Sequence, residues 1–190
     1  MHDTLTKLFL DASFSDELVR QIRARAREVP LKKNEVLIPQ GLRHKYVYLI
    51  ETGSLVKYLT TREGSKVPVW FYFDALNDIV LCPDGFFQGK PTKYEVVALE
   101  NTLVLQVSKL QMDLWLSEFP EFHDFYLERI IAGTIATDEM RACQLAYPPL
   151  EFLDYLDQEY PVFRQRLSSK NMARFIGVSP EWYSKLKRRR

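Results

Sequence analysis

The stretch LSSKNMARFIGVSPEWYSKLKRRR, residues 167–190, gathers the side chains of this chain that are best suited to bind a polyanion. It holds seven basic residues and one acidic residue, a net charge of +6, whereas the whole chain carries +1 and the remainder therefore −5. A basic end on an acidic body is typical of a protein that binds nucleic acid or a membrane surface at that end. A solvated, solubilising end is the alternative.

The same stretch carries the start and stop signals of two short helices. We expect Ser169 to cap a helix that runs to Ile176, Gly177 to supply a left-handed turn, and Ser179 with Pro180 to start a second helix. Apolar residues would hold the two helices together: Met172, Ala173, Ile176, Val178, Tyr183 and Leu186. This spacing indicates a helix-turn-helix, and a plain helical hairpin is the alternative.

The second of these helices has a polar outer face suited to the major groove of DNA. Its outward residues are Glu181, Ser184, Lys185 and Arg188. A lysine can donate to guanine and a glutamate can accept from cytosine. Phosphate contacts are expected from Ser169, Lys170 and Ser179 at the helix starts, and from Lys187 and the terminal arginines.

The elements before this end follow two different periods. Residues 15–29 place Leu18, Ile22, Ala26 and Val29 at helical spacing. From about residue 34 the chain consists of short runs of β-branched and aromatic residues, separated by turn residues. Two of them form a predicted hairpin around residues 62–65, where Gly64 supplies a positive φ. Seven or eight closely spaced strands without helical connections predict a double-sheet β-roll or jelly roll.

Helices are predicted after residue 108. Ser108 and Gln111 fit a capping box, and Pro120 fits the first position of a long helix that runs to about Ala146. The apolar residues of this helix lie on more than one side: Phe122, Phe125, Tyr126, Ile130, Ile131, Ile135 and Met140. A surface helix needs only one apolar stripe, so this helix is expected either to form a dimer seam or to be sandwiched within the monomer. Three small residues would allow another backbone to approach: Ala132, Gly133 and Ala136.

The segment that follows contains helix breaks at Pro148-Pro149 and at Pro161. The short helix between them is expected to pack through Leu150, Leu153, Tyr155 and Leu156. The predicted fold class is α+β, with an N-terminal double-stranded β-helix (jelly roll) flanked by helices, a long dimerisation helix and an all-α C-terminal helix-turn-helix domain. The predicted boundaries are 1–118 for the roll domain, 119–147 for the long helix and 148–190 for the C-terminal domain.

Two segments carry a resemblance to a known family. LIPQGLRHKYVYLIETG, residues 37–53, looks like the first β-roll signature of the Crp/Fnr family of bacterial transcription regulators, although Leu42 and His44 depart from its usual pattern. MARFIGVSPEWYSKLKR is similar to the recognition motif of that family, with Glu181 and Lys185 at the base-reading positions. The resemblance implies a homodimer through residues 119–147, an effector in the roll, and double-stranded DNA as partner. The β-wing of many members is not expected here.

The resemblance also implies an effector pocket. Members that bind cyclic nucleotides hold the phosphate with a short helix beginning Gly-Glu and with an Arg followed by Ser or Thr. Leu81 and Cys82 stand here where Gly-Glu belongs, and Thr92 and Lys93 where Arg-Ser belongs. These four residues are the expected effector pocket. Because the carboxylate and the guanidinium are missing, we do not expect cyclic AMP to bind in the usual manner.

Several function classes are not supported by the sequence. No apolar stretch approaches the roughly 20 residues of a membrane span, and no signal peptide is expected, so the protein is expected to be cytoplasmic. Cys82 and Cys143 are expected to be free thiols, and no cofactor is expected. A cupin-like metalloenzyme would need several converging ligands, but of His2, His44 and His123 only His44 lies in the predicted roll. No catalytic motif appears, so no enzymatic activity and no metal site are predicted. An effector-binding module whose helix-turn-helix contacts a protein is the alternative to a DNA-binding regulator.

Overall fold

The computed structural model describes residues 14–74, 76 and 78–188, without the side chain of Lys187. The expectations that fall on His2, on the side chain of Lys187 and on the two terminal arginines lie outside these residues. The chain divides into two compact units, Met1–Ile130 and Ile131–Arg190, and the division falls inside helix α5 (Pro120–Ala146). The domain limits at residues 118 and 147 stay a prediction.

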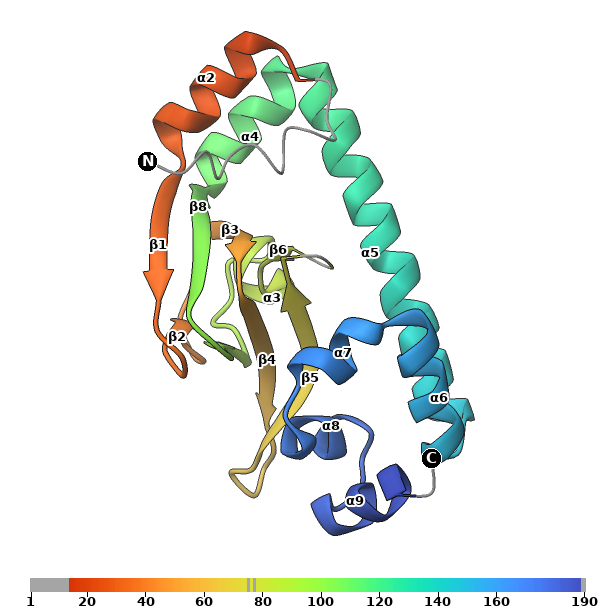
Figure 1. Cartoon of the computed structure of the whole chain (residues 1–190). Coiled ribbons are helices and arrows are strands. Elements are labelled where there is room, and N and C mark those ends of the chain that lie inside the picture. Colours follow the sequence, from red (N-terminus) through yellow and green to blue (C-terminus); the bar gives the residue numbers. More distant parts are fainter. Residues whose placement is uncertain (1–13, 75, 77, 189–190) are drawn as a thin grey trace. The chain divides into compact units, whose positions relative to one another are not determined.

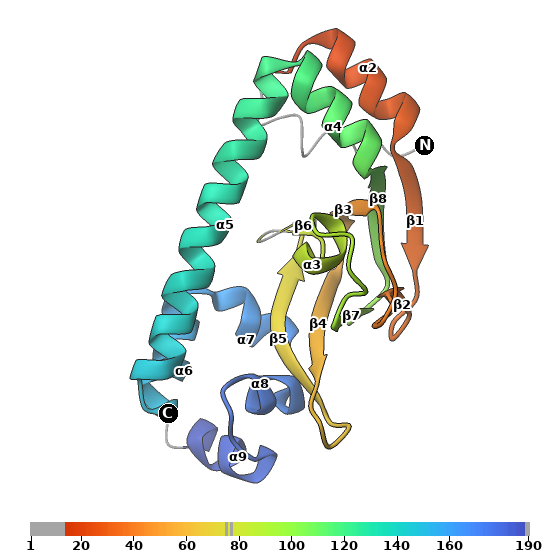
Figure 2. The same ribbon diagram turned by 180° about the vertical axis from the view of Figure 1, so that it is seen from behind.

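The first unit is built around eight strands. Their bounds are β1 (Arg27–Leu31), β2 (Val36–Ile38), β3 (Tyr46–Thr52), β4 (Ser54–Thr60), β5 (Lys66–Phe73), β6 (Ile79–Val80), β7 (Tyr94–Ala98) and β8 (Thr102–Ser108). They form two four-stranded sheets, ordered β1-β8-β3-β6 and β2-β7-β4-β5, and every pairing is antiparallel. Figure 1 shows the two sheets, and Figure 2 shows them from behind. The predicted α+β class with an N-terminal roll is confirmed.

The apolar core of this unit lies between the inward faces of the two sheets. Its buried members are Leu31, Ile38, Tyr48, Ile50, Leu55, Tyr72, Val80, Cys82, Val96, Ala98 and Val104. The hairpin between β4 and β5 forms as predicted. Gly64 has a φ of 81°, and its N–H donates to the carbonyl of Thr61 over 3.0 Å. A residue with a Cβ rarely adopts that φ, which explains the glycine.

The first helix is shorter than predicted. Helix α2 (Asp16–Arg25) buries Leu18 and Ile22 as expected, but Val29 belongs to β1 and pairs with Val104 of β8. The helical expectation for residues 26–29 was therefore wrong. Pro30 disfavours a helical conformation at the residue before it, and pairing with β8 satisfies the backbone of this segment instead.

Two further helices pack at the end of the roll. Helix α4 (Lys109–Glu118) begins as predicted, because the Ser108 hydroxyl accepts from the N–H of Gln111 over 3.2 Å. Helices α2 and α4 lie side by side in both views (Figures 1 and 2) and bury Leu18, Ile22 and Trp115 against each other. Helix α5 then starts at Pro120, as predicted.

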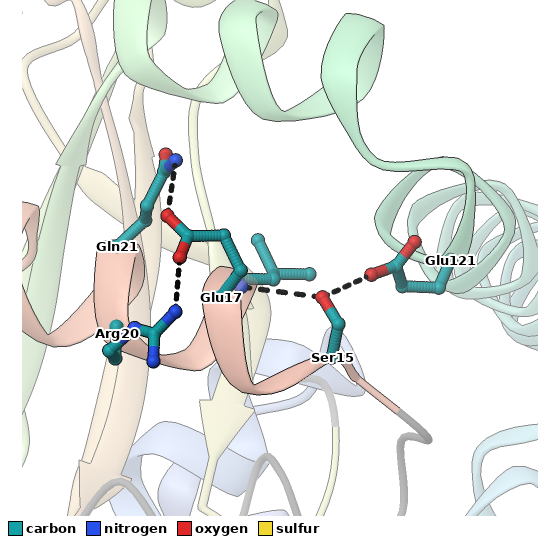
Figure 3. A network of polar contacts seen from close by, with 6 residues as sticks. Ser15, Glu17, Arg20, Gln21 and Glu121 are labelled. Atoms are coloured by element: carbon teal, nitrogen blue, oxygen red, sulfur yellow. Dashed lines mark hydrogen bonds and ion pairs between the residues drawn. The ribbon is translucent and has the colours of Figure 1, made fainter.

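The start of α2 is tied to the start of α5 by the contacts drawn in Figure 3. The hydroxyl of Ser15, the N-cap of α2, accepts from the N–H of Leu18 and donates to the Glu121 carboxylate over 2.7 Å. Glu17 accepts from Arg20 and from Gln21 on the next turn of α2. Of these contacts, the Ser15–Glu121 hydrogen bond joins the two helices, and the others lie within α2.

The second unit is helical. After the end of α5 it contains α6 (Pro149–Glu159), α7 (Pro161–Arg166), α8 (Ser169–Phe175) and α9 (Pro180–Arg188). The predicted breaks at Pro148-Pro149 and Pro161 are confirmed. The predicted packing face of α6 was partly wrong, since Leu150 is 39% exposed and the buried residues are Phe152, Leu153 and Leu156. Phe152 takes that place by packing its ring on Phe175 of α8, at 6.2 Å between centroids.

None of the helices that the structure describes is long and apolar enough to cross a membrane.

Candidate nucleic-acid interface and effector site

Helices α8 and α9 form the helix-turn-helix geometry that the sequence indicated. The chain turns at Gly177, whose φ is 78°, and the Val178 N–H donates to the carbonyl of Ala173 over 2.9 Å. Ser179 caps α9, because its hydroxyl accepts from the N–H of Trp182 over 3.1 Å. Pro180 is the first residue of α9, where its missing N–H costs no hydrogen bond.

The cap of α8 is one residue earlier than predicted. Ser168, and not Ser169, is the N-cap: its backbone is extended and its hydroxyl accepts from the N–H of Asn171 over 3.2 Å. Ser169 is the first helical residue, so its hydroxyl does not cap the helix. Either serine satisfies the sequence preference, and the backbone conformation at 168 decides between them.

The packing of α8 against α9 matches the predicted apolar set with two differences, at Val178 and Phe175. The buried residues are Met172, Ala173, Phe175, Ile176, Tyr183 and Leu186, whereas Val178 is only partly buried. Phe175 was not predicted. It contacts Phe163 of α7 at 5.8 Å between ring centroids, so it joins the helix pair to the rest of the unit.

The polar residues predicted to read DNA are all exposed. Those on or before α9 are Ser179, Glu181, Ser184, Lys185 and Arg188, and those at the start of α8 are Ser169 and Lys170. Lys170, Arg174, Lys185 and Arg188 are exposed basic side chains of helices α8 and α9. A helix pair with this exposed charge can contact phosphates and base edges at once.

Two of these side chains already have hydrogen-bond partners within α9. The Ser184 hydroxyl donates to the carbonyl of Pro180 over 2.9 Å. The pKa of Glu181 is lowered by its own backbone N–H and by the Ser179 hydroxyl, so its carboxylate stays ionised at the positive end of the helix. Lys185 is exposed and has no such local partner among the contacts of the described residues.

The expected effector residues surround the short helix α3 (Pro83–Phe86). Cys82 is the N-cap of α3 and is fully buried, Thr92 is 1% exposed, and Leu81 is partly buried. The Lys93 side chain is exposed, so only its backbone faces the helix. Thr92 and Lys93 are nonetheless brought to α3, because both donate to one carboxylate that sequence reasoning had not singled out.

That carboxylate is Asp84. Its oxygens accept from the Gly85 N–H over 2.9 Å, the Thr92 hydroxyl over 2.8 Å and the Lys93 N–H over 3.0 Å. Partial burial by itself would raise the pKa of Asp84, but the hydrogen bonds from Lys93, Thr92 and Gly85 outweigh it, and the pKa lies below its ordinary value. An internal anion thus uses the donors that this loop could offer to a ligand.

Lys57 is a second residue that the sequence did not single out. It lies on the inward face of β4, in register with Trp70 of β5 and Val96 of β7. Its ammonium lies 5.7 Å from the ring centre of Tyr72 and 5.1 Å from that of Tyr94. Desolvation by burial lowers the pKa of Lys57. Within the described part of the chain, no carboxylate oxygen lies within ion-pair distance of it.

His44, which departs from the family pattern, packs against the same short helix. Its Nε2 lies 3.1 Å from the carbonyl of Cys82, and its Nδ1 lies 3.2 Å from that of Tyr46. A Cβ on Gly85 would come within 2.5 Å of the imidazole ring, so this residue pair fits only with glycine at 85. Among the described residues, no group of three His, Cys, Asp or Glu could hold a metal ion.

Comparison with known proteins gives the class of this fold. Residues 28–118 match the family model described as the cyclic nucleotide-binding domain. A search of curated protein sequences finds no match.

The solved structures that match extend the likeness to the rest of the chain. A CooA mutant from Carboxydothermus hydrogenoformans has a TM-score of 0.71 at 16% identity and covers all of this chain and 84% of its own. FixK2 from Bradyrhizobium japonicum gives 0.69 at 16% identity, with 86% and 83% covered. A transcriptional regulator of the Crp/Fnr family from Eubacterium rectale gives 0.68 at 12% identity, with 93% and 83% covered. The chain therefore has the fold of the Crp/Fnr regulators.

Proposed function

We propose that this protein is a cytoplasmic, homodimeric transcription regulator that reads the major groove of double-stranded DNA with helix α9. The main observation behind the proposal is the exposed basic face of α9, a helix that follows the turn at Gly177 and begins at the N-cap Ser179. Lys185 and Arg188 have the chemistry to donate to guanine or phosphate, and Lys170 has that of a phosphate contact. The concentration of basic residues in this unit is not needed for packing the helices.

The proposed dimer uses the exposed apolar stripe of α5. Leu127, Ile130, Ile131 and Ile135 are 47%, 38%, 50% and 53% exposed. Their spacing of three, four and eight residues puts them on one face of the helix. Burying such a stripe against its copy would remove apolar surface from water, which favours association.

The proposed role of the roll is to bind a small effector that is not a cyclic nucleotide held in the usual manner. Two observations support this. The Asp84 carboxylate occupies the Gly85, Thr92 and Lys93 donors, and a second anion there would repel it. Lys57 provides a cation inside the roll, with no carboxylate oxygen of the described residues at ion-pair distance, where a charged or strongly polar ligand group could pair with it.

One observation favours the alternative, in which the helix pair contacts a protein. Trp182 is 42% exposed on α9, and exposed tryptophan is typical of protein interfaces. In that case the basic residues would steer association without reading bases.

The test is equilibrium binding to a labelled pool of random-sequence duplexes, measured by fluorescence anisotropy over a range of salt concentrations. We expect log affinity to fall linearly with log salt, and Lys170→Ala to reduce the slope by about 0.9 if one phosphate contact is lost. Lys90→Ala, an exposed lysine of the roll, is the matched control and should change neither slope nor affinity. No affinity at low salt, or equal effects of the two variants, would refute the proposal.

A further inference from the structure

A cavity of about 80 Å³ lies against the sheet β1-β8-β3-β6, lined mainly from the outer face of that sheet and also by Tyr48 of the roll core. Its floor includes Leu49 of β3 and Ile79 of β6. Its other walls come from helices α2, α4 and α5, among them Met112, Trp115 and Phe122. The cavity is therefore separate from the residues of α3 and from the inward-facing Lys57.

The walls of this cavity are dry. All thirteen lining residues are aliphatic, aromatic or methionine. The indole N–H of Trp115 is turned to Gln21, to which it donates over 3.2 Å, and the Tyr48 hydroxyl lies 3.5 Å from the amide nitrogen of Gln106. Water needs two to four polar partners in a buried site, and these walls offer almost none.

The cavity is partly open to solvent, and several of its lining residues are only partly buried. Its apolar walls would leave a water molecule inside it with few hydrogen-bond partners. Three aromatic rings line one wall of the cavity. Trp115 and Phe122 meet edge to face with 5.6 Å between their centroids, and the centroid of Phe122 lies 6.4 Å from that of Phe125. An aromatic-walled cavity that offers water few polar partners is suited to an apolar guest.

We propose that this cavity is a binding site for a small uncharged apolar molecule, such as an aromatic ring or a short hydrocarbon. An apolar cavity of about 150 Å³ holds benzene. The present one is smaller, about 80 Å³, so a benzene ring would fit only by extending through its open side, and smaller guests would fit inside. A charged or strongly polar guest would lose its hydration without gaining a hydrogen bond.

The position of the cavity links its guest to α5. Phe122, Phe125 and Tyr126 lie on the first two turns of that helix. The first turn of α5 is tied to the start of α2 by Ser15 and Glu121, shown in Figure 3, and its third turn is tied to the residue before β6 by Arg129 and Asp78 over 3.4 Å. A guest would press on the helix between these two attachments. If the proposed dimer is correct, the apolar stripe of α5 begins at the next residue, Leu127.

The test uses benzene as the probe and methyl NMR as the readout. In the full chain, we expect benzene to shift the methyl resonances of Ile79 and Met112 saturably and to raise Tm. Ala26→Leu places a larger side chain in the wall and should abolish both effects, whereas Ala24→Leu, the same change on the exposed side of α2, should leave both unchanged.

The readout does not depend on DNA binding or on dimer formation. If Ala26→Leu does not fold by circular dichroism, Val47→Ile fills the same cavity with a single methylene and should weaken binding. The proposal is overturned if benzene gives no saturable shift in the wild type, if the shifts spread evenly over the chain, or if the folded cavity-filling variants bind as the wild type does.

Discussion

Lys57 places an ammonium among the apolar residues of the roll, at a cost in folding free energy. Tyr72 and Tyr94 offer their ring faces, which compensates part of the lost hydration. Burial lowers the pKa of Lys57, which means that the folded state binds this proton less tightly than the unfolded chain does. A residue that a protein keeps against stability is a candidate for function.

We predict that Lys57→Met raises the free energy of unfolding by about 1 kcal/mol at pH 7, because a largely desolvated cation is replaced by an apolar side chain. The sign of the pH dependence follows from the lowered pKa. The penalty in the wild type is largest where both states are protonated and disappears above the ordinary lysine value of about 10.4. Denaturation of both proteins from pH 7 to 10.5 measures it. This account would be contradicted if Lys57→Met did not raise the free energy of unfolding, or if the exposed control Lys90→Met raised it equally.

Asp84 has the opposite effect on stability. Its pKa is lowered in the folded state, so its contribution is present above the ordinary aspartate value of about 3.9 and is lost as pH falls through the folded pKa. We predict that Asp84→Asn lowers the free energy of unfolding by about 1–3 kcal/mol at pH 7. The amide keeps one acceptor oxygen, but its NH₂ group cannot accept the hydrogen bonds that the second carboxylate oxygen accepts, and the negative charge is lost.

The difference between wild type and Asp84→Asn should therefore shrink below about pH 4. Asp113→Asn is the control, since its ion pair with Lys109 is exposed and contributes little. A difference between wild type and Asp84→Asn that does not change with pH would show that the carboxylate charge is not what holds the loop.

At the scale of the elements, helix α5 offers two possible dimer seams, the exposed apolar stripe and the side with the small residues, and a pair of variants distinguishes them. The exposed apolar stripe and the small residues Ala132, Gly133 and Ala136 lie on different sides of the helix, because 3.6 residues make one turn. We predict that Ile131→Glu converts the dimer to monomer in sedimentation velocity, since it puts a charge in the stripe. Ala132→Glu, the neighbouring change, should leave the dimer intact.

The reverse result would move the seam to the small residues. A wild-type chain that sediments as a monomer at every concentration tested would remove the proposed dimer altogether.

Most element boundaries followed from local signals, and the exceptions have a common cause. Gly64, Pro120 and Ser179 fix their turns or helix starts through their own backbone chemistry, and the structure confirms each of them. Val29 fits either a helix face or a strand, and its pairing with Val104 decides. That pairing joins residues far apart in the sequence, which no local pattern contains.

The candidate sites divide in the same way. The residues of α9 were found from the sequence because a helix presents its outward positions at a fixed spacing. Asp84 and Lys57 were missed because their importance comes from what approaches them: the Thr92 hydroxyl and Lys93 N–H in one case, and the rings of two other strands in the other. That the Lys57 side chain lies on the inward face of β4 could be inferred only once the strand register was known.

At the scale of the whole molecule, the chain combines an acidic roll unit with a basic helical unit, and α5 belongs to both. The order of roll, long helix and helix-turn-helix predicted the fold class, and the match of residues 28–118 and the solved structures confirm it. What each unit binds does not follow from the fold, because one fold serves many ligands. The roles of Lys185, Lys57 and α5 therefore stay predictions.

The most direct test of the central claim is to select genomic DNA fragments with the purified protein at two salt concentrations and to sequence those retained. The account predicts a two-fold site with half-sites about one helical turn apart, weakened by salt and lost in Lys185→Ala but not in Lys90→Ala. Retention of nothing, or of all fragments equally, would contradict sequence reading by α9 and would favour the protein-contact alternative.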